Sequence, residues 1–399
     1  MLLALPTPFA FAFGTAAAFT ALLVRMRLSG AGFFVIFAGI LLLIHGSVTV
    51  LLYPWLGVFQ PLFVALQVSA ALYIGGLGQP RLRGVLWRGL VAVPGSAFVA
   101  GSFLSMPWAA AAAMGFTPVG WWLPWILAGV GLVRSLSTRQ ERVDLSIDRA
   151  PVAGLVRAPR AGKRTERPLR VVQITDPHLG TFMSAERLAR ICERAVAQDP
   201  DLILLTGDYL TFESNRDPES LARALAPLAK AEGRVFACLG NHDHEAPATV
   251  RRGLEAARAR LLVDEATLVQ TPAGLVQIVG MDYRRSERGA HMARVCRQFP
   301  RVPGAFRLVL LHDPTAFSEL PEGEADLVLS GHTHGGQVGL VSLGLDWTVV
   351  SGIFELPDHG FWARGRDRMY IHRGSGHYGF PLRVGVPAEE SVLHIHRLD

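Results

Sequence analysis

The first 140 residues contain no aspartate or glutamate. Up to position 133 the only charged side chains are Arg25, Arg27, Arg81, Arg83 and Arg88. A helix that crosses a bilayer needs about 20 mostly apolar residues. Five stretches meet this requirement, at approximately 5–24, 31–53, 56–77, 89–110 and 118–133. The sequence therefore predicts an all-α transmembrane bundle of about five helices over residues 1–134, with the lipid bilayer as its partner.

The loops between these stretches alternate between basic and uncharged. Cytoplasmic loops of membrane proteins carry the excess of Lys and Arg, so we expect the N-terminus outside and everything after residue 134 in the cytoplasm, beside a multi-pass inner membrane. A cleaved signal peptide over residues 1–18 is the alternative, because Ala16–Ala18 offers a small-residue site. Cleavage there would reverse the topology, but the segment lacks the basic start of a signal peptide.

A basic segment follows the predicted bundle. Residues 157–170 contain six Lys or Arg and one acid, Glu166. We expect residues 135–168 to be a juxtamembrane linker that anionic lipid attracts. The remainder of the chain is nearly balanced in charge and has no basic and aromatic stripe, so we expect no nucleic-acid partner. Three scattered cysteines, Cys192, Cys238 and Cys296, predict no disulfide partner.

From residue 169 the pattern changes to short apolar runs that each end in polar side chains. The runs are "LRVVQITDPH", "DLILLTGD", "RVFACLGNHD", "FRLVLLHD" and "ADLVLSGHTH". Continuous apolar runs are typical of strands covered on both faces, and ligands gather at the carboxyl ends of such strands. The polar residues at these five ends are Asp176, His178, Asp208, Asn241, His312, His332 and His334. Oxygen and nitrogen ligands without sulfur, in this number, suit two divalent metal ions that share a carboxylate.

The last of these motifs, "SGHTHGGQVG", places two histidines one residue apart. A helix would present paired histidine ligands four residues apart, so we expect His332 and His334 to point from one tight turn toward two different ions. Glycines at 331, 335 and 336 would let the backbone approach the ions without Cβ clashes.

The ordered set of D-x-H, GD, GNHD, a strand-end histidine and GHTH resembles the calcineurin-like metallophosphoesterase superfamily. "SGHTHGGQV" and "YIHRGSGHYGFPLRVGVPAE" further resemble its membrane-anchored bacterial branch. The resemblance implies an α/β domain over residues 169–399, a two-sheet β-sandwich flanked by helices, with two divalent metals, Mn²⁺ first and Fe or Zn as alternatives. One ion would be held by Asp176, His178 and His334 and the other by Asn241, His312 and His332, with Asp208 bridging them.

The same resemblance makes His242 the candidate catalytic residue, which would protonate the leaving oxygen. In phosphatase members a second Asp often follows the bridging Asp and orients this histidine, but "GDYLT" has Thr211 there, so the partner of His242 stays open. Arg284 and Arg285 are either a clamp for a second phosphate or part of an exposed charged face. The apolar stretch from Val338 to Trp362 either packs as core, which is the commoner outcome, or lines a groove for acyl chains.

These residues predict hydrolysis of a phosphodiester or pyrophosphate. Tethering to a membrane favours an amphiphilic, phosphorylated substrate such as a UDP-diacylglucosamine-type pyrophosphate. A general phosphodiesterase or phosphoprotein phosphatase that is anchored only for location is the alternative within enzymes. A scaffold or sensor on a non-catalytic phosphoesterase fold is the alternative outside them.

Overall fold

The computed structural model describes residues 44–76, 81–160, 162–377 and 379–398. They divide into two compact units. The first comprises the described residues up to Val133 together with Gly379–Val384, and the second comprises the remainder. The first predicted span, most of the second, and the alternative signal peptide lie outside the described residues.

The first unit is helical. Its helices are 44–52, α3 (Gln60–Gly76), α4 (Val85–Trp87), the π-helical turn η3 (Arg88–Ala92), α5 (Val93–Leu104), α6 (Met106–Ala113) and α7 (Leu123–Ser135), with short 3₁₀ turns η1 (Tyr53–Trp55) and η2 (Gly57–Phe59). Within the described residues, two apolar helical stretches are long enough to cross a membrane, Gly57–Ile74 and Val85–Leu104. The apolar helix α7 has 13 residues, fewer than a span of about 20 requires.

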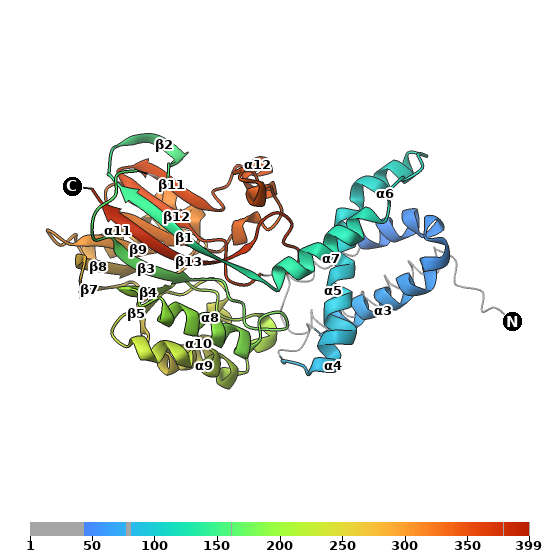
Figure 1. Cartoon of the computed structure of the whole chain (residues 1–399), viewed down its shortest axis with the longest axis horizontal. Coiled ribbons are helices and arrows are strands. Elements are labelled where there is room, and N and C mark those ends of the chain that lie inside the picture. Colours follow the sequence, from blue (N-terminus) through green and yellow to red (C-terminus); the bar gives the residue numbers. More distant parts are fainter. Residues whose placement is uncertain (1–43, 77–80, 161, 378, 399) are drawn as a thin grey trace. The chain divides into compact units, whose positions relative to one another are not determined.

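The second unit contains two mixed β-sheets (Figure 1). The first has the order β1 (Thr138–Ile147), β13 (Ala388–Arg397), β3 (Leu169–Ile174), β4 (Leu202–Leu205), β5 (Val235–Ala237), β6 (Arg260–Leu261). The second has the order β2 (Val152–Arg157), β11 (Gly360–Gly365), β12 (Asp367–Ile371), β10 (Leu327–Ser330), β9 (Phe306–Leu310), β8 (Gly274–Gly280), β7 (Glu265–Thr271). All five strands expected from the apolar runs are present, and they are central and buried.

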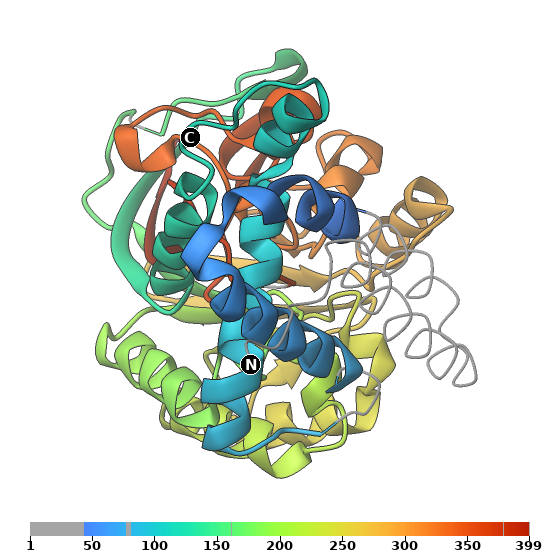
Figure 2. The ribbon, with the colours of Figure 1, turned by 90° about the vertical axis from the view of Figure 1, so that its right-hand side faces the viewer.

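Helices cover the outer face of each sheet. On the first sheet lie α8 (Ala185–Ala197), α9 (Pro218–Leu225) and α10 (Pro247–Ala256), drawn in green to yellow-green in Figure 1 and Figure 2. On the second lie α11 (Arg288–Gln298) and the 3₁₀ turn η7 (Pro314–Glu319). Ser184 caps α8 by accepting a hydrogen bond from the backbone of Arg187, as its Ser-x-Glu start predicts.

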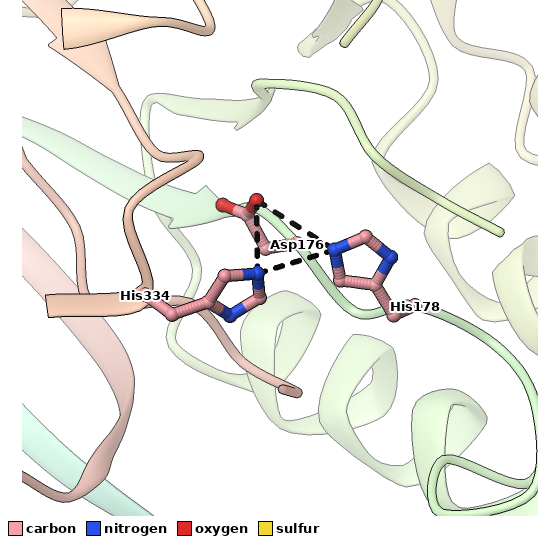
Figure 3. Close-up of side chains that lie close together, drawn as sticks. All are labelled: Asp176, His178 and His334. Atoms are coloured by element: carbon pink, nitrogen blue, oxygen red, sulfur yellow. Dashed lines mark hydrogen bonds and ion pairs between the residues drawn. The ribbon is translucent and has the colours of Figure 1, made fainter. Parts of the chain in front are cut away.

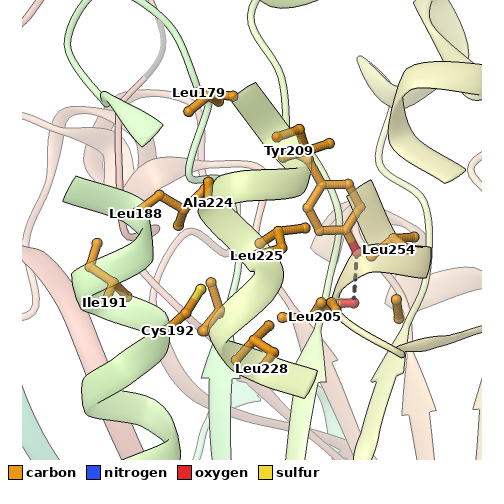
Figure 4. Packing of buried hydrophobic residues seen from close by; sticks show 14 of the residues in the cluster. Leu179, Leu188, Ile191, Cys192, Leu205, Tyr209, Ala224, Leu225, Leu228 and Leu254 are labelled. Carbon is orange, nitrogen blue, oxygen red and sulfur yellow. Dashed lines mark hydrogen bonds between the residues drawn. The ribbon is translucent and has the colours of Figure 1, made fainter. Parts of the chain in front are cut away.

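Three apolar layers hold these elements together. Leucines, isoleucines and valines of both sheets pack face to face. A second layer packs α8, α9 and α10 on the first sheet, with Leu188, Leu225 and Leu254 fully or almost fully buried (Figure 4). The third layer lies under α11. Removal of this apolar area from water, at about 25 cal/mol per Å², is what makes the sandwich of sheets flanked by helices stable.

The segment 135–168 differs from the expected linker. Ten of its residues form β1, which pairs in parallel with β13 along its full length, and six form β2 at the edge of the second sheet. Val143, Leu145 and Ile147 alternate with polar residues in β1 and are buried between the sheets. A basic composition therefore does not mark this whole segment as linker, because alternate apolar residues of β1 are buried while Arg142 and Asp144 between and beside them are not.

Candidate metal centre

Residues after β3 and β10 form the first of two candidate metal clusters. Asp176 and His178 follow β3, and His334 lies in the turn η8 (His334–Gly336) after β10. The Nε2 atoms of His178 and His334 are 3.2 Å apart, and Asp176 Oδ1 lies 3.9 Å from the first and 3.6 Å from the second (Figure 3). All three side chains are buried. Three donor atoms this close converge on one point, as ligands of a single ion do.

The second cluster comes from three different strand ends. Asp208, His312 and His332 follow β4, β9 and β10, and their candidate ligand atoms lie within 4.8 Å of one another. The side-chain oxygen of Asn241, after β5, is buried and has no hydrogen-bond partner among the described residues. A buried carbonyl oxygen without a partner is costly unless something polar or charged meets it. The donor set therefore fits a hard or borderline divalent cation.

Asp208 connects the two clusters. Its Oδ2 atom lies 3.6 Å from His178 Nε2 in the first cluster and 3.3 Å from His312 Nε2 in the second. Its other oxygen accepts a hydrogen bond of 2.9 Å from the backbone N–H of His242. One carboxylate oxygen thus faces donors of both clusters.

Backbone carbonyls set the orientation of two imidazoles. The Nδ1 atom of His312 lies 2.7 Å from the carbonyl oxygen of Thr206, and that of His178 lies 3.1 Å from the carbonyl of Leu210. A proton on Nδ1 directs Nε2, as the unprotonated atom, into the cluster. Such partners fix the tautomer and orientation of metal-binding histidines.

The backbone at these residues is conformationally strained. Asp176, His178, Asp208, His332 and His334 all have φ between +45° and +67°, the left-handed region that residues other than glycine rarely adopt. Strain of this kind gathers at functional sites, where the surrounding structure imposes it. Five predicted ligands share it, which indicates that the fold holds their side chains in place against local preference.

The expected close approach of glycine is found at Gly331. A Cβ atom there would lie 2.1 Å from Asp176 Oδ2 and 2.3 Å from Thr175 Oγ1. Gly335 and Gly336 have φ of +64° and +70°. Position 331 must therefore be glycine, because any side chain there would overlap the carboxylate of Asp176.

The electrostatics of the centre favour a positive charge. Burial lowers the pKa of His178 and of His332 to about 4, so both are neutral near neutral pH, the form that binds metal. Burial raises the pKa of Asp176 to about 6. Burial disfavours charge on His312, but the carboxylate of Asp208 outweighs burial and raises the pKa of His312 to about 10. A cation next to these carboxylates is therefore stabilised.

His242 lies beside the clusters and has a partner that the sequence did not reveal. Its ring meets that of His178 edge to face, with the centroids 5.5 Å apart. Its Nδ1 atom lies 3.0 Å from Glu245 Oε1, and Asn215 donates to the other oxygen of Glu245 at 3.1 Å. Burial disfavours charge on His242, but the hydrogen bond to Glu245 and the nearby carboxylates of Asp208 and Asp243 together outweigh burial and raise the pKa of His242. Glu245, not a residue at position 211, is the carboxylate beside this histidine.

Asp243 supports the loops of the centre. Its carboxylate accepts hydrogen bonds from the backbone N–H groups of Asp208, Tyr209 and Gly240, at 2.7–2.9 Å. It thereby ties the ends of β4 and β5 together. In the sequence, Asp243 stands directly after Gly240, Asn241 and His242. That position alone is compatible both with capping of the loop and with support of the metal ligands.

The two arginines after β8 are not drawn into the clusters by any described contact. Arg284 pairs with Asp282, with 3.2 Å between Nη2 and Oδ2, and is half exposed. Arg285 is exposed. Tyr283, which sequence reasoning passed over, has its ring centroid 6.4 Å from that of His332.

Comparison with known proteins indicates the family to which the chain belongs. The family model for calcineurin-like phosphoesterases matches residues 169–336. Phosphodiesterase YaeI of Escherichia coli is 30% identical over 234 residues, which cover 57% of this chain and 82% of that protein. The uncharacterized metallophosphoesterase YkoQ of Bacillus subtilis is 30% identical over 250 residues, 59% of this chain and 86% of its own length.

A third relative is the transmembrane protein with metallophosphoesterase domain of Danio rerio. It is 27% identical over 239 residues, which cover 55% of this chain and 52% of that protein. Its match, the matches to the two bacterial relatives and the two carboxylate–histidine clusters all indicate the same family. The chain belongs to the calcineurin-like phosphoesterase family and is a metal-dependent phosphoric ester hydrolase.

Proposed function

We propose that this protein is a membrane-anchored phosphodiesterase that uses two divalent metal ions to hydrolyse a phosphodiester or pyrophosphate bond. The observation that carries the proposal is the position of Asp208, one oxygen of which lies within 3.6 Å of histidine nitrogens in both clusters. A shared carboxylate is what a two-metal site needs to hold its ions about 3.5–4 Å apart.

Each cluster would hold one ion. Asp176, His178 and His334 would bind the first, and His312, His332 and Asn241 the second, with Asp208 between them. We propose Mn²⁺ as the native metal, because the ligands are carboxylate, amide and imidazole without thiolate. When bound, the two ions would activate water and neutralise the charge that develops on the phosphoryl oxygens.

His242 would supply the proton for the leaving oxygen. It lies beside the clusters, is largely buried, and is held by Glu245, which favours its protonated form. An imidazolium positioned next to the scissile bond stabilises the leaving oxygen and can transfer Nε2–H to it. Glu245 would act through His242, by fixing its ring and tautomer.

We propose an amphiphilic substrate, for example a nucleotide-linked diacylated sugar of the UDP-diacylglucosamine type. The phosphodiesterase relative supports a diester or pyrophosphate rather than a monoester. The two long apolar helices and the transmembrane relative support location at a membrane, where a substrate with acyl chains is concentrated. Arg284 or Arg285 would meet a second phosphate of such a pyrophosphate.

For the membrane part we propose a bundle of about five helices over residues 1–134, in the inner membrane, with the catalytic domain in the cytoplasm. The alternation of basic and neutral loops supports this orientation. A fluorescent protein fused to the C-terminus of the full chain tests it, since it would fluoresce in the cytoplasm, whereas an alkaline phosphatase fusion at the same place would stay inactive.

The activity test uses the detergent-solubilised full chain loaded with Mn²⁺. Hydrolysis of bis(p-nitrophenyl) phosphate, p-nitrophenyl phosphate and a UDP-linked diacylated sugar would be compared, with Asp208→Ala as the control and metal content measured in parallel. We expect diester or lipid-pyrophosphate turnover that the substitution abolishes together with the loss of bound metal.

The other outcomes separate the alternatives. Monoester turnover alone would favour a phosphatase that is anchored only for location. Two bound metals without turnover of any of the three substrates would contradict the proposed substrate class, and a protein that binds no metal would be a scaffold.

A further inference from the structure

Residues 340–356 form an exposed apolar segment beside the metal centre. Seven of their side chains are large, apolar and exposed: Leu340, Leu343, Leu345, Trp347, Ile353, Phe354 and Leu356. Among the described residues of the second unit only four other large apolar side chains are equally exposed, and they are scattered over four elements or loops. The segment is therefore a concentrated patch, which we call the apolar platform.

The expected core packing of the stretch from Val338 to Trp362 is thus wrong for most of its length. Phe361 is buried at 3% exposure, as a core residue would be, but Phe354 is 62% and Leu343 is 75% exposed. A patch of this kind on a soluble domain marks a surface that contacts a protein or a membrane.

The platform is ordered and tied to the metal loop. It contains the 3₁₀ turn η9 (Val341–Leu343) and the short helix α12 (Val349–Ile353), of which Figure 1 labels α12. Thr348 caps α12 and pairs with Gly339 in an isolated bridge. Two residues beyond the platform, the carbonyl of Asp358 accepts a hydrogen bond of 2.7 Å from Thr333, the residue between His332 and His334. A contact made by the platform is therefore made next to the centre.

Basic residues border the platform. The guanidinium of Arg157 donates to the carbonyl oxygen of Asp346 at 3.1 Å and stacks over the ring of Trp362 at 4.7 Å. Arg157 begins the basic segment that continues with Arg160, Lys163 and Arg164, and Arg160 lies close to Gly360. Arg157 is itself paired with Asp346 and Asp358, and Asp346 and Glu355 are exposed acids within the platform. The positive charge available to a lipid surface is therefore that of Arg160, Lys163 and Arg164. An apolar patch with an exposed tryptophan and such a margin is a combination that binds the interface of an anionic bilayer.

We propose that the apolar platform inserts into the surface of an anionic lipid bilayer and holds the metal centre at the level of the lipid head groups. The basic margin selects a lipid surface over a protein partner, because phosphate head groups complement it and apolar side chains enter the layer below. This inference rests on the proposed location of the protein at a membrane, and it explains how a phosphoester near the head groups would reach the centre without leaving the bilayer.

The test places a fluorescent label on the platform of the full chain. Leu343→Cys and Phe354→Cys would each be labelled with an environment-sensitive dye, and the protein reconstituted in nanodiscs of phosphatidylcholine and phosphatidylglycerol. The native cysteines Cys192, Cys238 and Cys296 are buried, so the label would be selective. Leu268→Cys is the matched control, because Leu268 is an apolar residue with 51% exposure outside the platform.

Two quenchers then report the position of each label. We expect spin-labelled lipid chains to quench the dye at Leu343 and Phe354 and to leave it unquenched at Leu268, because an interfacial segment lies about 5–10 Å into the boundary of the acyl chains. Iodide in the water should show the opposite pattern. Replacement of phosphatidylglycerol by phosphatidylcholine should weaken the lipid quenching.

Quenching of the platform labels by iodide, as at Leu268, would overturn the proposal. Protection from both quenchers would also overturn it, since protein would then cover the platform. All labels would be measured in the Asp208→Ala background as well, so the result does not depend on catalysis. An inactive enzyme with lipid-quenched labels would refute the proposed function alone, and wild-type turnover of the soluble diester shows that each labelled variant is folded.

Discussion

Replacement of Glu245 by Gln should impair turnover most strongly for substrates with a poor leaving group. The side chain of Glu245 lies 3.0 Å from Nδ1 of His242 and is the hydrogen-bond partner that, with the carboxylates of Asp208 and Asp243, raises the pKa of this histidine. Gln keeps the shape but removes the charge, so the protonated form of His242 becomes less favourable. Only a reaction that needs the proton of His242 is affected by this change.

The size of the effect follows from the exposure of the pair. A hydrogen bond between charged groups contributes about 1.5–3 kcal/mol when it is shielded. Glu245 is 43% exposed, so we expect the lower end, about 1–1.5 kcal/mol. Because about 1.4 kcal/mol corresponds to a tenfold change in rate, kcat should fall about tenfold with an alkyl leaving group. His242→Ala should cost at least about 100-fold on the same substrate.

The assay compares kcat and KM for two diesters that differ only in the leaving group, p-nitrophenolate or a simple alkoxide. Both variants should lose much less activity on the p-nitrophenyl ester, because that oxygen leaves without a proton. Glu232→Gln is the control, since Glu232 is an exposed acid paired with Arg258. The reasoning fails if Glu245→Gln slows both diesters equally, if only KM changes, or if the bound metal is lost.

Three other perturbations test the centre and the fold. Gly331→Ala should lower the number of bound metal ions and the turnover together, since its Cβ would displace Asp176; unchanged metal content by mass spectrometry would contradict this. Burial opposes charge on Glu389, but His372 and Arg373 outweigh burial and hold its pKa well below the ordinary range. The ionised Glu389 therefore stabilises the folded state fully above about pH 4.3, the pKa of a glutamate in the unfolded chain. This stabilisation is lost as the pH falls toward the lower pKa that Glu389 has in the folded state. Glu389→Gln should lower the free energy of unfolding by about 1.5–3 kcal/mol at neutral pH, because it removes one of the two carboxylates, Glu389 and Glu141, that pair with the buried Arg373; the difference in melting temperature from the wild type should shrink below about pH 4. A chelator should abolish turnover and lower the melting temperature, and Mn²⁺ should restore both; a chelated protein with full turnover would refute the metal requirement.

The central strands were predictable because they are buried on both faces. An uninterrupted run such as Leu202–Leu205 has no other stable place in a soluble domain, and all four of its side chains are fully buried. β1 was not predicted, because four of its ten residues are charged and only Val143, Leu145 and Ile147 show the apolar alternation of a strand. Its pairing with β13, about 250 residues further along the chain, leaves no local mark.

The metal ligands could be predicted from the sequence, whereas Glu245, the partner of His242, could not. Asp176, Asp208 and His312 each follow an apolar run directly, so their position at a strand end was readable. Glu245 follows no strand. It reaches His242 only because residues 243–245 form the 3₁₀ turn η6, which brings side chains three residues apart together. In an extended loop the same residue would point away from the histidine.

Exposure is the property that sequence conveys least, and the apolar platform shows why. A run that contains Trp347 and Phe354 has the composition of core, and burial would be its ordinary outcome. Whether such a run is covered depends on the elements around it, and here the caps and bridges of α12 fix the backbone while the large side chains remain at the surface. Local hydrogen bonds, and not burial, therefore stabilise this segment. An apolar surface that is held rigid in this way costs free energy in water, and that cost is recovered only if the platform meets an apolar phase.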